Sequence, residues 1–500
     1  MKSKLLVVLL VLIPCFANGQ KPTTFEGMDA SQLPKPEFDV DPNGAIGTKQ
    51  YLEWVNPYVQ AFDKVTFLPL WSAPISAGDI WLKNGIQNCN IAGDGVVLFD
   101  RLASRWVIGG HNSISIAGPY YYCIAVSSTD DLSSPTLVWY TYQFLLNTGV
   151  NSQNNPYFPD WPKIAAWADA YYLSFDLLDP NKKYMDIGIE ACAMDRTNIL
   201  NHATASPMQC FSDPNPIPLN GTPYLRHSLI PADVEGTTAP PVGRNEFFVS
   251  IQNPRLDGKT TTSTALNLWA FHVDWAIPKN STFTNSPLTV KSFTPGCYSP
   301  AKPTTTVCVP EPALNTHGHH YIIDSVGDRL MPRLSYRNFG TYESLLTSHT
   351  VRVGAALNLQ TAVRWYELRA TGGATPAIYQ SGNVDPDIKL YRFMPSIAQD
   401  HKGNAAVGYS ISSPTVHPGI RESSWSLQVK PKPVEVNLQH GSGDVEDSML
   451  WGDYTSMTVD PVDDCTFWYV NNYLQANEVG GAINWDTRIA KFALASCTGK

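Results

Sequence analysis

The chain has 500 residues, of which 43% are hydrophobic and 16% are charged, and its formal net charge at pH 7 is −9. This hydrophobic content is enough for a large folded core, and the excess of acidic groups argues against nucleic acid and anionic membranes as partners. No stretch approaches the roughly 20 consecutive apolar residues that a membrane-spanning helix needs, so we expect no membrane span.

The first residues have the pattern of a secretory signal. Two lysines precede an apolar run over residues 5–13, and small residues at 17–19 suit cleavage. We therefore expect a signal peptide over residues 1–19 and a secreted, extracellular mature protein. Loss of the two lysines with this leader would change the net charge from −9 to −11.

Six times along the chain, an apolar stretch runs into an aspartate at a turn and is followed by a second β-rich run. The turns recur at intervals of 60 to 91 residues, which indicates one supersecondary unit used repeatedly. The runs are rich in aromatic and β-branched residues, as strands are. The turn residues are Asp100, Asp169, Asp233, Asp324, Asp400 and Asp460.

Each unit contains three or four such runs, which predicts a four-stranded antiparallel sheet. A further unit begins at the front of the chain, where a turn at residues 41–47 leads into two more runs. Seven such sheets arranged radially form a seven-bladed β-propeller with a central channel, and six blades are the alternative if the front unit only completes the last one. We expect an all-β fold with one propeller domain over residues 38–497 and an N-terminal extension over residues 20–37. Closure would pair residues 487–494 with the first blade.

Four segments carry a resemblance to known proteins: DPNGAIGTKQYLEWVNPYVQAFDK, FPDWPKIAAWADAYYLSFD, RLSYRNFGTYES and WGDYTSMTVDPVDDCTFWYVNNY. They resemble secreted bacterial proteins of the β-propeller type and are loosely similar to the sialidase superfamily of Asp-box propellers. The resemblance covers most of residues 38–497 and implies the fold, but it implies no catalytic set. Ser128-Thr129-Asp130 with Trp139 matches an Asp-box only in part, since the expected glycine is missing.

Eight cysteines follow the leader, and an even number in an exported chain indicates a disulfide framework. Many connectivities are possible, and pairing neighbours within the repeats is the simplest. The absence of any CxxC pair weakens the alternative of a metal site. The expected disulfides are Cys89–Cys123, Cys192–Cys210, Cys297–Cys308 and Cys465–Cys497. Two sequons, at Asn220 and Asn280, would be glycosylated in a eukaryotic host.

Ligands of propellers usually bind where the innermost strands begin, because the loops of every blade converge there. Counting back six to nine residues from each turn reaches this position and predicts a polar ring, acidic on one side and basic on the other. The acidic members are Asp41, Asp94, Asp160 and Asp453, and the basic members are Arg226, His227, His317 and Arg392.

Crowded carboxylates raise one another's pKa, so Asp94, Asp160 and Asp453 are candidate catalytic acids and bases. Alternatively, these three aspartates and Asp41 share a hard cation, for which Ca²⁺ is the natural choice outside the cell. The plainest alternative is that they cap strand ends and accept hydrogen bonds from backbone amides.

The basic members of the ring would bind an anionic group of a substrate, such as a uronate or a sulfate. Three aromatic residues near the predicted ring are candidates for stacking on sugar faces, although most aromatic residues of the chain must pack between blades. They are Trp161, Trp451 and Tyr454.

No GxSxG elbow, HExxH helix or Walker loop is present. One hypothesis is a carbohydrate-active enzyme, either a glycoside hydrolase or a polysaccharide lyase, that acts on an acidic extracellular glycan in the funnel. The others are a non-catalytic glycan-binding or matrix protein and a protein-interaction propeller. We expect a monomer in each case.

Overall fold

The computed structural model describes residues 21–91, 93–112, 118–214, 217–219, 222–224, 228–252, 262–298, 306–354, 359–429, 433–446, 449–477 and 483–498. These residues form 32 strands, three short 3-10 turns and three short α-helices, α1 (Gly78–Leu82), α2 (Arg196–Leu200) and α3 (Ala495–Thr498). The expected all-β fold is confirmed. None of the helices in the described ranges has the length and apolar character needed to cross a membrane. The predicted signal peptide lies outside the described residues.

Four sheets each contain four antiparallel strands in chain order. Their inner strands are almost fully buried, whereas the outer strands, such as β9, alternate between partly buried and exposed residues because one face meets solvent. The sheets are β2 to β5 (Asn43–Ile46, Gln50–Val55, Tyr58–Asp63, Ile75–Ser76), β6 to β9 (Gly93–Asp100, Arg105–His111, Tyr121–Ser127, Trp139–Leu145), β10 to β13 (Phe158–Ala166, Tyr171–Asp179, Met185–Met194, Gln209–Pro214) and β26 to β29 (Tyr391–Gln399, Asn404–Ser413, Val416–Ser426, Val434–Gln439).

A larger sheet has eight strands, formed by two antiparallel sets of four that meet through a parallel pairing of β16 with β22. Two short hairpins lie outside these sets. The eight strands are β16 to β19 (Ile230–Val234, Glu246–Ile251, Ser263–His272, Thr282–Phe293) and β22 to β25 (Leu330–Asn338, Glu343–Val353, Gln360–Ala370, Ala377–Val384). The hairpins are β14 with β15 (Ile217–Leu219, Thr222–Tyr224) and β20 with β21 (Val307–Leu314, His320–Asp324).

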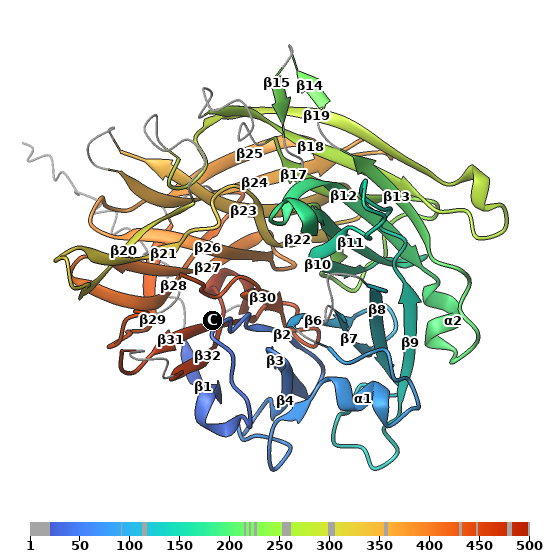
Figure 1. The fold of residues 1–500 in the computed structure, drawn as a ribbon, viewed down its shortest axis with the longest axis horizontal. Coiled ribbons are helices and arrows are strands. Elements are labelled where there is room, and N and C mark those ends of the chain that lie inside the picture. The colour runs from blue at the N-terminus through green and yellow to red at the C-terminus, as the bar shows by residue number, and fades with distance from the viewer. Residues whose placement is uncertain are drawn as a thin grey trace, which may run out of the picture.

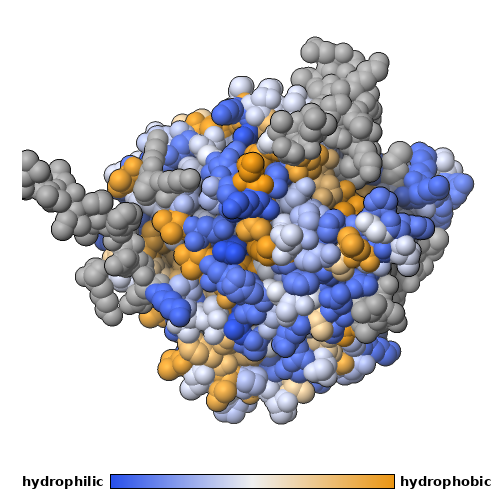
Figure 2. All heavy atoms as spheres, turned by 90° about the vertical axis from the view of Figure 1, so that its left-hand side faces the viewer, coloured by the Kyte–Doolittle hydropathy of each residue, from blue (hydrophilic) through white to orange (hydrophobic). Residues whose placement is uncertain are grey.

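The sheets are arranged around a centre, and the first strand of each set contacts the first strand of the next (Figure 1). The contacts run from β2 to β6, β10, β16, β22, β26 and β30, and from β30 back to β2. Radial four-stranded sheets with a closed circuit of inner strands define a β-propeller. The face of the molecule in Figure 2 is largely polar, with hydrophobic residues scattered among polar ones.

The N-terminal strand closes the ring. Strand β1 (Thr23–Asp29) pairs with β32 (Trp485–Phe492), and this pairing completes the sheet that contains β30 (Ser456–Val459) and β31 (Phe467–Leu474). The predicted closure, residues 487–494 against the first blade, is therefore wrong. The predicted N-terminal extension instead supplies the outer strand of the last sheet, where Phe25 stacks on Phe67 with ring centroids 4.8 Å apart.

Five of the six predicted turns lie where a first strand meets a second. Three of the aspartates there, Asp100, Asp400 and Asp460, cap the turn; Asp100 Oδ1, for example, accepts hydrogen bonds from the amides of Leu102 and Ala103, both at 3.1 Å. Asp233 instead accepts a hydrogen bond from the amide of Ala166 in another sheet. The prediction for Asp324 is wrong, because this residue ends β21 of the inserted hairpin. The first strand of that set is β22, which runs into its turn at Asn338.

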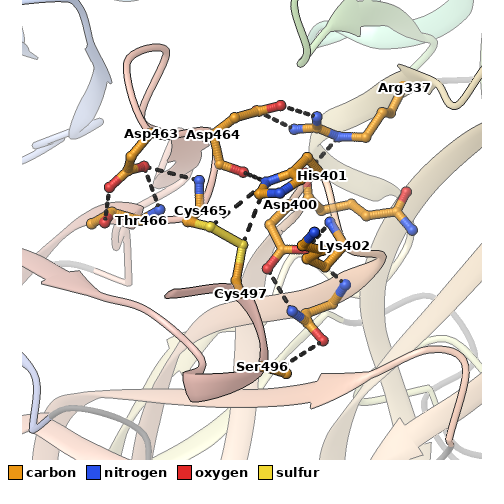
Figure 3. The surroundings of a disulfide bond; sticks show 12 residues. Arg337, Asp400, His401, Lys402, Asp463, Asp464, Cys465, Thr466, Ser496 and Cys497 are labelled. Carbon is orange, nitrogen blue, oxygen red and sulfur yellow. Dashed lines mark hydrogen bonds and ion pairs between the residues drawn. A yellow bond between two sulfur atoms is a disulfide. The ribbon is translucent and has the colours of Figure 1, made fainter. Parts of the chain in front are cut away.

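All four predicted disulfides are present, which favours an oxidising compartment. Figure 3 shows how Cys465–Cys497 ties helix α3 to the turn between β30 and β31. Next to it, Arg337 of β22 donates to both carboxylate oxygens of Asp464, at 2.7 and 2.8 Å, so a strand of another sheet also holds this turn (Figure 3). The sequon residue Asn280 is exposed, and Asn220 lies outside the described residues.

The junction between β1 and the first sheet buries an acid. Glu53 of β3 has no exposed surface and accepts a hydrogen bond from the amide of Met28 at 2.8 Å. Burial raises the pKa of Glu53 to about 8 from its ordinary value of 4.5. Between these two values the unfolded chain releases a proton that the folded chain keeps, so this group destabilises the fold as the pH rises.

We therefore predict that Glu53→Gln stabilises the protein at pH 8, by up to about 4 kcal/mol on this linkage, and has little effect near pH 4.5. Urea unfolding between pH 5 and 9 measures the difference. Glu446→Gln, at a half-buried glutamate that accepts from Asn477, is the control. A parallel pH dependence in both variants would contradict the assignment.

Candidate functional site

The structure brings all four predicted acidic ring members together at one end of the central axis. Asp41 precedes β2, Asp94 and Asp160 lie near the starts of β6 and β10, and Asp453 precedes β30. A fifth acid, Asp39, joins them: carboxylate oxygens of Asp39, Asp41 and Asp453 all lie within 4.8 Å of one another. Asp41 also lies against Asp94, whose charge in turn acts on Asp160. We name these five residues the acid group.

An unusual backbone conformation positions these side chains. Asp41 and Asp94 have φ of 41° and 53°, and Trp161, which follows Asp160, has φ of 57°. Positive φ is uncommon outside glycine, and aspartate is among the residues that tolerate it. In β6 and β10 it coincides with a shift in strand register, and such bulges redirect side chains.

A chain of contacts beneath the acid group fixes Asp41. Its Oδ2 accepts a hydrogen bond from Asn56 Nδ2 at 2.7 Å, and Asn56 Oδ1 accepts from Trp54 Nε1 at 3.2 Å. A Cβ atom at position 95 would lie 1.7 Å from the Trp54 ring, so only Gly95 lets this indole pack beside Asp94.

The members of the acid group differ in exposure. Asp41 is only 1% exposed, whereas Asp94 has 19% of its side chain exposed. Asp39, Asp160 and Asp453 are also half-buried. Asp41 therefore forms the floor, and the other four carboxyl groups reach the solvent.

Three basic side chains lie among these acids. His111 Nε2 is 3.5 Å from Asp94 Oδ2. The Lys163 ammonium lies 3.9 Å and 3.7 Å from the ring centroids of Trp161 and Tyr454, and burial lowers the pKa of Lys163 to about 7. The third basic side chain is Arg329, which pairs with Asp328 at 3.1 Å and Asp176 at 3.6 Å.

The crowded carboxyl groups favour their protonated forms. Burial raises the pKa of Asp39 to about 7; a hydrogen bond with Asp41 opposes this shift, and the charge of Asp94 adds to it. Burial, followed by the charge of Asp39, raises the pKa of Asp41 and of Asp453 well above the ordinary value. Asp39, Asp41 and Asp453 therefore cannot all be ionised at once unless a cation compensates their charges.

The pKa values of Asp94 and Asp160 are shifted in opposite directions. Burial would raise the pKa of Asp94, but the hydrogen bond and charge of His111, together with the charge of Lys163, outweigh it and lower the pKa. Burial and the negative charge of Asp94 raise the pKa of Asp160, against the effect of Arg329. Asp94 is thus the ionised member beside an acid that keeps its proton more readily.

A small cavity lies next to the acid group, since Tyr454, which follows Asp453 in the chain, is among the residues that line it. This cavity of about 20 Å³ lies between Lys163 and Tyr454 on one side and Asp233 and Arg333 on the other. This is room for about one water molecule.

Of the predicted basic members of the ring, the two that the structure describes, His317 and Arg392, are not part of this site. Arg226 and His227 lie outside the described residues. His317 is exposed in the turn of the inserted hairpin, because the unit was assigned to β21 instead of β22. Arg392 is buried in ion pairs with Glu435 at 2.6 Å and Asp387 at 3.0 Å. The charges that act on the acids come from His111, Lys163 and Arg329, which sequence reasoning had not placed there.

The three predicted stacking residues are covered by protein. Trp161, Trp451 and Tyr454 are 6%, 1% and 0% exposed. Lys163 lies against the rings of Trp161 and Tyr454, and Trp451 Nε1 donates to Ser410 Oγ at 2.8 Å. Rings so deeply buried offer little surface for stacking on a sugar, so the burial favours a packing role over the predicted binding of substrate.

Comparison with known proteins adds little. Neither a protein-family model nor a curated protein matches the sequence. A solved alpha-L-arabinanase of Penicillium chrysogenum, complexed with arabinobiose, is 8% identical over 94% of this chain and 98% of that chain, with a TM-score of 0.39. The GH93 alpha-L-arabinofuranosidase of Fusarium graminearum with arabinobiose is 8% identical over 95% and 98%, also at 0.39.

The endo-arabinase of Bacteroides thetaiotaomicron is 11% identical over 69% of this chain and 94% of that chain, with a TM-score of 0.30. At these values the likeness carries no argument about this chain. The similarity to sialidases that the sequence suggested is not shown by these comparisons.

We predict that Arg329→Met lowers the free energy of unfolding by about 3–5 kcal/mol, because Asp328 and Asp176 lose their buried cationic partner. Lys49→Met is the matched control: this lysine is 58% exposed and 2.8 Å from Asp131, and its loss should cost less than about 1 kcal/mol. Urea unfolding compares the two. Equal losses would show that Arg329 does not hold the site together.

Proposed function

We propose that the chain is a secreted, seven-bladed β-propeller that acts as a monomeric glycoside hydrolase, and that its acid group cleaves a neutral extracellular glycan. In this count the eight-stranded sheet represents two blades, since its halves are antiparallel sets of four strands. The leader pattern and the four disulfides support secretion.

One observation carries the proposed activity: half-buried carboxyl groups from different sheets converge at one end of the axis. Hydrolysis of a glycosidic bond uses two carboxyl groups, one as proton donor and one as a base or nucleophile. Asp94 is paired with His111 and suits the ionised role. Asp160, beside it and half-buried, suits the proton donor. Asp453 was expected in the catalytic set, but Asp39 and Asp41 crowd its oxygens, so we leave it out.

The charges at the site favour a neutral glycan over the acidic one that the sequence suggested. Five carboxyl groups gather there with three basic side chains, His111, Lys163 and Arg329. Lys163 is buried, and Arg329 is already paired with two aspartates. A uronate or sulfate would therefore meet repulsion.

A panel of polysaccharides tests the activity: neutral arabinan, xylan and galactan against anionic polygalacturonate and alginate, with release of reducing ends as the readout. We expect product from a neutral polymer. Asp94→Asn and Asp160→Asn should each reduce the rate about 10²–10⁴-fold, the usual contribution of an acid or base.

Asp274→Asn is the control, because this aspartate accepts the amides of Ala276 and Ile277 in a turn after β18. It should leave the rate unchanged. Binding of a glycan without any product would reject the hydrolase in favour of a binding protein, and turnover confined to anionic polymers would reject the neutral substrate.

A further inference from the structure

Three members of the acid group have oxygens that no donor among the described residues satisfies. The Oδ1 atoms of Asp39, Asp41 and Asp453 are buried and receive no hydrogen bond from an N–H or hydroxyl group of the described residues. Their near neighbours are one another's carboxylates, within 4.8 Å. Two carboxylate oxygens attract each other only through a proton or a cation between them, so the protein alone leaves this cluster incomplete.

The hydroxyl group of a neighbouring tyrosine also lacks a partner among the described residues. Tyr454 is fully buried, and its hydroxyl has no partner among the described residues. The charges of Asp94, Asp41, Asp160 and Asp453 all act on this phenol. Buried hydroxyls normally find a partner, and an unplaced ion with its water is a common explanation when they do not.

The surroundings of Asp41 are those of a metal ligand. Asn56 holds one carboxylate oxygen at 2.7 Å, and the other oxygen is buried without a donor. Asn56 is itself fixed by Trp54. Outer hydrogen bonds of this kind orient the ligands of metal sites.

We propose that Asp39, Asp41 and Asp453 form a calcium site that joins the first and last sheets at the axis. The donors are all carboxylate oxygens, which hard cations prefer over the nitrogen and sulfur ligands of zinc. The half-buried positions of Asp39 and Asp453 leave an open side for the water that completes the coordination of Ca²⁺. A divalent ion between three ionised carboxylates also reduces the local charge from −3 to −1.

This site would have a structural role. Asp39 and Asp41 precede the first inner strand, and Asp453 precedes the last. A cation held by all three would clamp the beginning and the end of the ring together, and it would stabilise the folded chain by binding only to it. The proposal holds whether or not the protein is a hydrolase, because it needs no substrate.

Isothermal titration of the chelator-treated mature protein with CaCl₂, followed by thermal unfolding with and without Ca²⁺, tests the site. We expect one Ca²⁺ per chain and a higher Tm with calcium. Asp41→Asn and Asp39→Asn should weaken binding at least about tenfold.

Asp63→Asn is the matched control, since this carboxylate accepts the amides of Val65 and Thr66 in an exposed turn. It should bind Ca²⁺ as the unaltered protein does. The proposal is overturned if Ca²⁺ gives neither heat nor a change in Tm, if both site variants bind normally, or if Mg²⁺ binds equally well. Glycan hydrolysis is not a readout, so failure here is distinct from failure of the proposed activity.

Discussion

Closure of the ring is the constraint on which the rest of the structure depends. The pairing of β1 with β32 joins segments from the two ends of the chain, and the inner strands β2 and β30 meet on the same side of the ring. Only this closure brings Asp39 and Asp41 against Asp453. It also has a cost, because it buries Glu53 beneath β1 and crowds carboxylates at the axis.

The acidic side chains of the acid group and those elsewhere in the protein have different partners. Away from the acid group, acids of one set of strands pair with arginines of other sets: Glu235 lies 2.6 Å from Arg101 and 2.9 Å from Arg333, and Arg337 binds Asp464. Such pairs link neighbouring sheets. In the acid group, by contrast, carboxylates face carboxylates. Uncompensated charge costs stability, and its presence at a solvent-facing position is typical of functional sites.

The sequence predicted the sheets, five of the turns, the disulfide pairs and the meeting of four acids, because all of these follow from patterns repeated within each unit. It failed where a feature depends on non-local packing. The hairpin of β20 and β21 precedes the first strand of the fifth unit, and its final residue, Asp324, resembles the turn that ends a first strand. Counting back from Asp324 therefore gives His317, whereas counting back nine residues from the true turn at Asn338 gives Arg329. Arg392 had the expected position, but its partner Glu435 lies on the far strand of the sheet, and burial of the aromatic residues has no local signal.

The most direct test is a crystal structure of the mature protein grown with strontium chloride, a calcium substitute with a strong anomalous signal. The account predicts a single anomalous peak between the carboxylates of Asp39, Asp41 and Asp453, in a ring closed by β1 against β32. It would be contradicted if the three side chains pointed to separate regions of solvent with no peak between them, or if β1 lay elsewhere.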